Sequence, residues 1–68
     1  MFVNLKLIKD YIKKNGLTYQ QFCEKARIDI FDFKKLIIHD HDIDVLVLLK
    51  IAKILNIHIR ELFTDQKI

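Results

Sequence analysis

The residues with the clearest chemical potential in this 68-residue sequence are the alternating histidines and aspartates of residues 39–42, which read HDHD. Imidazole and carboxylate groups are ligands for transition-metal ions. A metal site needs about three converging ligands and a supporting shell of hydrogen bonds, which alternation within one turn does not supply. We therefore favour a solvated loop over a metal site and expect no metal or other cofactor.

Covalent and catalytic chemistry find no support in the sequence. Cys23 is the single cysteine, which excludes an internal disulfide and a cysteine metal cluster, and a free thiol suits a reducing cytosol. No nucleophile and base stand at a recognised spacing, and a chain with one glycine has no glycine-rich phosphate loop. The sequence thus predicts a protein that is not an enzyme and has no small-molecule substrate.

The distribution of charge is more informative than the net charge of +3. Residues 29–44 carry five aspartates against the two lysines Lys34 and Lys35, so the excess of cations lies elsewhere. Four of these cations fall on the first predicted helix, at Lys6, Lys9, Lys13 and Lys14. We interpret them as the solvated face of an amphipathic helix, with contact to phosphate as the alternative.

Composition indicates one small all-α domain spanning residues 1–68. Hydrophobic residues make up 51% of the chain, and it has no proline and one glycine. No apolar run approaches the roughly 18 residues of a membrane span. The first residues, MFVNLKLIK, lack the basic segment and long apolar stretch of a signal peptide. We therefore expect a cytoplasmic protein without membrane contact.

Caps and hydrophobic periodicity predict five helices, over about residues 5–14, 19–26, 30–38, 45–55 and 59–63. The residues expected to cap their first turns are Asn4, Thr18, Asp29, Asp44 and His58. Each cap is preceded by an apolar residue that can pair with the fourth residue of the helix as a hydrophobic staple. The pairs are Val3 with Ile8, Leu17 with Phe22, Ile28 with Phe33, Ile43 with Leu48 and Ile57 with Leu62.

The third predicted helix, within DIFDFKKLII at residues 29–38, is apolar on two sides. At about 3.6 residues per turn, Phe33 and Leu36 share the face expected to join the core. The spacing i, i+3, i+4, i+7 places four other residues on a second face. These residues are Phe31, Lys34, Lys35 and Ile38.

From Leu17 to Phe63 the sequence resembles the Cro and phage-repressor helix-turn-helix family, often called XRE-type. The segment LTYQQFCEKARID matches the usual family wording LTQEELAEKAGVS without a gap. The segment LLKIAKILNIHIRELF matches LLKLAKALGVSLDELF in the same way. The resemblance implies a compact five-helix, lambda-repressor-like DNA-binding domain, with the helix-turn-helix proper at about residues 18–38.

The same resemblance implies that the third helix lies in the major groove of duplex DNA. Phosphate contacts would come from Thr18, Tyr19 or Gln20, at the start of the second helix. Base contacts would come from Ile30, Phe31, Asp32, Lys34 and Lys35. Contacts with the DNA backbone after the third helix would fall at His39 and His41.

The chain departs from the family at these positions. The family usually offers Arg, Ser, Thr or Gln where Ile30, Phe31 and Asp32 stand, so two positions here are apolar and one repels phosphate. Two glycines of the family, after the second and third helices, are Arg27 and His39. The recognition helix is therefore degenerate.

Surplus apolar residues point to protein contact. Phe31 and Ile38 can pack within the domain, contact thymine methyl groups or contact a protein. The fourth helix is apolar almost all round, and a chain of 68 residues can hardly bury all of this apolar surface. The surplus favours a dimer or a heteromer. The residues expected at such an interface are Phe31, Ile38, Leu46, Val47 and Ile59.

Two functions remain from the sequence. The first is a small transcriptional regulator of the Cro or phage-repressor type that binds duplex DNA through its third helix as a dimer. The second is a helix-turn-helix-fold protein, such as an antirepressor or co-regulator, that contacts a partner repressor instead of reading DNA.

Overall fold

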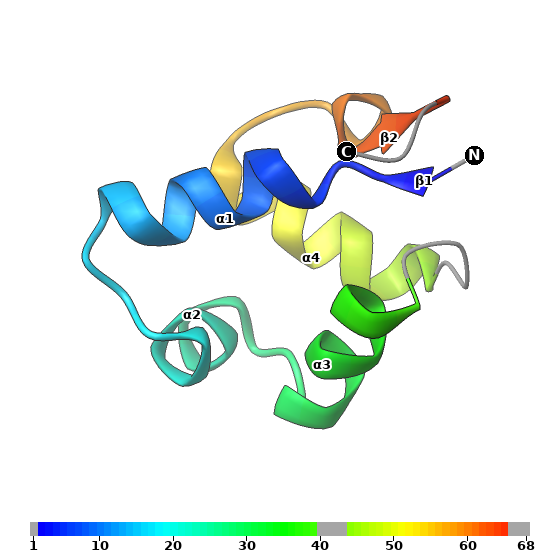
Figure 1. Ribbon diagram of the computed structural model, residues 1–68. Helices are drawn as coiled ribbons and strands as arrows, with labels where there is room; N and C mark the ends of the chain where they lie inside the picture. The colour runs from blue at the N-terminus through cyan, green and yellow to red at the C-terminus, as the bar shows by residue number, and fades with distance from the viewer. Residues whose placement is uncertain (1, 40–43, 66–68) are drawn as a thin grey trace.

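The described part of the protein is mostly helical, with four α-helices arranged around one core. A computed structural model describes residues 2–39 and 44–65. The helices are α1 (Leu5–Lys14), α2 (Tyr19–Ala26), α3 (Ile30–Ile38) and α4 (Val45–Leu55), followed by a short 3-10 helix, η1 (Ile59–Leu62). Helix α4 is central and contacts α1, α2 and η1 (Figure 1). None of the helices in these described ranges has the length and apolar character needed to cross a bilayer.

The helices begin where side chains satisfy the free amides of the first turn. The Gln21 amide donates to Thr18 Oγ1 at 3.1 Å, and the Thr18 amide donates to Gln21 Oε1 at 2.9 Å, which completes a capping box. Asp29 Oδ1 accepts from the Phe31 amide at 2.8 Å. Asn4 and Asp44 accept from first-turn amides in the same way. These four predicted starts are confirmed.

Helices α1, α2 and α4 are each followed by a residue in the left-handed backbone conformation. Gly16 has φ 65°, Arg27 φ 58° and Asn56 φ 57°. The amide after each of them donates back across the helix end: Leu17 to the Ile12 carbonyl, Ile28 to Cys23 and Ile57 to Ala52. This closure satisfies carbonyls of the last turn and normally favours glycine at the left-handed position. Arg27 and Asn56 take up that conformation with a side chain.

The core includes Phe33 and Leu36, which the periodic pattern placed on the inner face of α3, and side chains from the other helices. Phe22 and Phe33 have no exposed surface, and their ring centroids lie 5.5 Å apart. The other buried residues are Val3, Ile8, Ile12, Cys23, Ala26, Ile28, Leu36, Val47, Leu48, Ile51, Ala52 and Leu62. The predicted staple residues are therefore buried, apart from the half-buried Leu17 and Ile57. Ile43 lies outside the described residues.

The predicted fifth helix, over residues 59–63, begins at Ile59 after the predicted cap His58, but it is a 3-10 helix instead of an α-helix and ends at Leu62. The segment forms one turn of 3-10 helix, held by the Glu61 amide to the His58 carbonyl at 2.9 Å. Phe63 leaves it to begin strand β2 (Phe63–Thr64), which pairs antiparallel with β1 (Phe2–Val3). The Asn4 amide also donates to the Leu62 carbonyl at 2.7 Å. A pairing between opposite ends of the chain, visible at the top right of Figure 1, overrides a local helical signal.

Candidate functional site

Helices α2 and α3 form one packed unit that leaves a side of α3 turned outward. Only residues 27–29 connect them, so α3 begins directly beside the end of α2 (Figure 1). The rings of Phe22 and Tyr19 on α2 both contact Phe33, each at a centroid distance of 5.5 Å. Aromatic pairs at this distance contribute packing beyond the area they bury. The rings hold α3 by its buried side.

The outward face of α3, defined by Phe31, Lys34, Lys35 and Ile38, is exposed along its length. Phe31 keeps 75% of its surface in contact with solvent and Ile38 keeps 72%. Both lysines between them are also exposed. The predicted division of this helix into a core face and a second face is therefore confirmed. The second face offers two positive charges between two apolar side chains.

The start of α3 is acidic. Asp29 caps the helix, and Asp32 lies exposed in its first turn. Carboxylates at this end are favourable for the helix because they face its positive pole. The same carboxylates repel phosphate, and the half-buried Ile30 packs against the core instead of reaching outward. The positions that would contact bases by resemblance to the Cro and phage-repressor family therefore differ in character. The first three are apolar or acidic, and the cations begin at Lys34.

The start of α2 supplies neutral polar groups. Thr18 uses its hydroxyl in the capping box, and the Tyr19 ring leans on Phe33. Gln20 is exposed, and its Nε2 lies 3.5 Å from Glu24 Oε1. A helix N-terminus of this kind presents backbone N–H groups to an anion. After α3, His39 is exposed, whereas His41 lies outside the described residues.

The residues expected at a protein interface are not all on the surface. Leu46 is 71% exposed, and the neighbouring Val45 and Leu49 are also exposed. Val47 is a correction, because only 6% of its surface reaches solvent and it joins the core. Ile59 is half-buried. Adjacent helix positions point about 100° apart, so burial of Val47 and exposure of Leu46 follow from the way α4 is seated.

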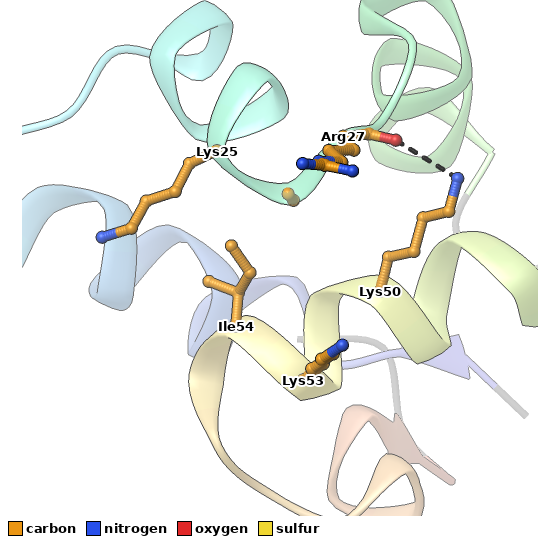
Figure 2. Close-up of a pocket in the computed structure, with 6 residues that line it drawn as sticks. Lys25, Arg27, Lys50, Lys53 and Ile54 are labelled. Atoms are coloured by element: carbon orange, nitrogen blue, oxygen red, sulfur yellow. Dashed lines mark hydrogen bonds between the residues drawn. The ribbon is translucent and has the colours of Figure 1, made fainter.

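A basic pocket that the sequence reasoning did not single out lies between the end of α2 and α4. Its volume is about 590 Å³, and it is lined by Lys25, Ala26, Arg27, Lys50, Lys53 and Ile54 (Figure 2). Lys50 and Lys53 share one face of α4 by their spacing, which is the only local signal. Their approach to Arg27 depends on how the two helices cross and is not encoded in either segment.

The described cysteine, histidine and acidic side chains form no reactive centre: the one thiol is buried, and the others do not cluster as metal ligands. Burial raises the pKa of the Cys23 thiol, and the negative charge of Asp29 raises it further. A buried thiol of this kind is unreactive. Within residues 2–39 and 44–65, no three His, Cys, Asp or Glu side chains gather as metal ligands. Most of the HDHD turn lies outside these ranges.

No protein-family model, curated protein or solved structure matches the chain.

Proposed function

We propose that the protein is a small transcriptional regulator that binds duplex DNA through the outward face of α3. The observation that carries this proposal is the exposure of Lys34 and Lys35 in the middle of a helix whose other side is fixed in the core. In the proposal, α2, residues 27–29 and α3 serve as a helix-turn-helix. The lambda-repressor-like architecture and the dimeric state expected of such regulators belong to the same proposal.

The chemistry assigns different work to the two helices. Lys34 and Lys35 approach phosphate oxygens or the acceptor edge of guanine, since lysine can bind both. Tyr19 and Gln20 position α2 on the backbone, together with the amides of its first turn. Phe31 supplies at most an apolar contact, for example to a thymine methyl group. A protein with this role acts in the cytoplasm, where the DNA of a phage-type regulator lies.

The test is a titration of duplex DNA at several salt concentrations with the wild type and the double variant Lys34→Gln/Lys35→Gln. We expect weaker binding by the variant, and a slope of log K against log salt that flattens by roughly 0.9 for each lost phosphate contact. The matched control is Lys9→Gln/Lys13→Gln, which removes the same charge from exposed positions of α1.

The proposal fails if the wild type does not bind duplex DNA at low salt. It also fails if both double variants lose the same affinity, because the effect would then reflect net charge and not the outward face of α3. Circular dichroism spectra of both variants establish that they remain folded.

A second candidate function is protein binding, and the exposure of Phe31, Ile38 and Leu46 favours it. Contiguous patches of large apolar side chains on a protein surface often mark contact sites, whereas isolated exposed apolar residues are common and carry no such meaning. An aromatic side chain at the centre of an interface commonly contributes 2 kcal/mol or more. In this candidate the chain modulates a partner repressor, and the lysines influence mainly the association rate.

A further inference from the structure

Four cationic residues line the pocket between the end of α2 and α4: Lys25, Arg27, Lys50 and Lys53. Figure 2 shows Arg27 at the end of α2 and Lys53 on α4, on opposite sides of the space between these elements, with Lys50 reaching across to the Arg27 carbonyl. Lys25 extends to the far side of Ile54. None of the described residues that line the pocket is acidic. Every charged side chain that lines the pocket is therefore cationic.

Part of this arrangement has a local explanation. Lys25 and Lys53 lie in the last turns of α2 and α4, where cations offset the negative pole of a helix. Lys50 Nζ donates to the Arg27 carbonyl at 3.2 Å and so secures the end of α2. The helix poles account for Lys25 and Lys53, and the hydrogen bond accounts for Lys50, which reaches from α4 to the end of α2. Together these residues place four positive charges around one pocket, and their mutual repulsion is relieved when an anion binds.

We propose that this pocket binds a small anion that carries a diphosphate group. A concave site lined by one sign of charge concentrates counter-ions. Guanidinium binds phosphate oxygens in pairs, and lysine adds a mobile point charge. The pocket volume of about 590 Å³ exceeds the space that one phosphate fills, and the cations are spread across it. A diphosphate offers oxygen atoms on two phosphorus centres, so more than one of these cations can bind it at once.

The pocket is prepared for such a ligand before binding. The hydrogen bond to the Arg27 carbonyl fixes Lys50, so less side-chain freedom is lost when the anion arrives. Ala26 and Ile54 add an apolar floor beside the cations. This floor can receive an organic group attached to the diphosphate, as in a nucleoside diphosphate.

The site is independent of the proposed DNA contact. None of the residues of the outward face of α3 lines the pocket. Its cations come instead from the end of α2 and from α4. Binding of diphosphate can therefore be measured on the protein alone, and the result does not depend on whether DNA binds.

The experiment is a titration of the full chain with pyrophosphate, followed by amide NMR shifts at 0.15 M salt, an ionic strength at which long-range attraction is screened. We expect saturable shifts confined to the amides of residues 25–27 and 50–54. Lys53→Gln should weaken binding about tenfold, the loss that corresponds to one charge-assisted hydrogen bond. The matched control is Lys13→Gln, which removes one exposed charge in the last turn of α1 and should change little.

Two further titrations identify the source of the diphosphate. Tighter binding of adenosine diphosphate than of pyrophosphate indicates a nucleotide, and equal binding indicates the inorganic ion. Shifts that do not saturate, or equal losses in Lys53→Gln and Lys13→Gln, overturn the site. A flattened salt slope for duplex DNA in Lys53→Gln also overturns it, because the pocket would then be part of the DNA contact.

Discussion

Phe31 and Phe33 lie two positions apart on α3 and should respond in opposite ways to truncation. Phe31→Ala removes a side chain that is 75% exposed, whereas Phe33→Ala removes one with no exposure. A fully buried phenylalanine covers roughly 150–250 Å², so the buried quarter of Phe31 covers about 40–60 Å². At about 25 cal/mol per Å², that area contributes about 1–1.5 kcal/mol.

The helix itself offsets part of the loss at Phe31. Alanine is the better helix former by about 0.5 kcal/mol, so the net cost of Phe31→Ala should be about 0.5–1 kcal/mol. Phe33→Ala also leaves a cavity beside the Phe22 ring and should cost about 3–5 kcal/mol. For a domain of this size that is a large part of the whole stability.

Urea unfolding followed by circular dichroism measures both costs from the transition midpoints at equal slope. The same Phe31→Ala protein is then titrated with duplex DNA. If α3 reads DNA, the salt slope should stay at the wild-type value, because Phe31 neutralises no phosphate. Sedimentation equilibrium tests protein contact on the same sample, and there Phe31→Ala should weaken association about 30-fold or more if its ring is an interface anchor.

Two results would refute this reasoning. A cost for Phe31→Ala equal to that of Phe33→Ala would place Phe31 in the core and remove the outward face. An unchanged midpoint for Phe33→Ala would mean that the α2–α3 packing does not depend on the central ring.

Further predictions concern the ends of the helices and the buried thiol. Thr18→Ala should lower stability by about 1 kcal/mol through loss of the α2 cap, and an unchanged urea midpoint would show that α2 does not depend on it. Arg27→Gly should raise stability by roughly 0.5–1 kcal/mol. A residue with a side chain costs about 1–2 kcal/mol in the left-handed backbone conformation, and the larger chain entropy of glycine in the unfolded state cancels part of this gain. Gly16→Ala, at φ 65°, should lower the midpoint for the same steric reason although no atom blocks the added carbon. The Cys23 thiol, whose pKa is raised, should react with a thiol reagent at pH 8 far more slowly than in urea-unfolded protein, and equal rates would contradict its burial.

The sequence was most informative where a signal acts within a few residues. The start of a helix depends on one side chain and the next three backbone amides. The sequence therefore predicted the caps Thr18 and Asp29, which accept from the amides of Gln21 and Phe31. The two faces of α3 were readable for the same reason, because periodicity separates Phe33 from Phe31. The DNA-contact residues rest on resemblance, and their role stays a prediction.

Tertiary structure decided what neighbouring segments do to one another. Helix α4 is apolar almost all round apart from Lys50 and Lys53, so its pattern did not show that Val47 enters the core while Leu46 stays outside. The pairing of Phe2–Val3 with Phe63–Thr64 joins the two ends of the described chain and shortened a predicted helix. The basic pocket exists only because α4 crosses the end of α2 and brings Lys50 to the Arg27 carbonyl. Such contacts depend on the relative placement of whole helices, which no local pattern encodes.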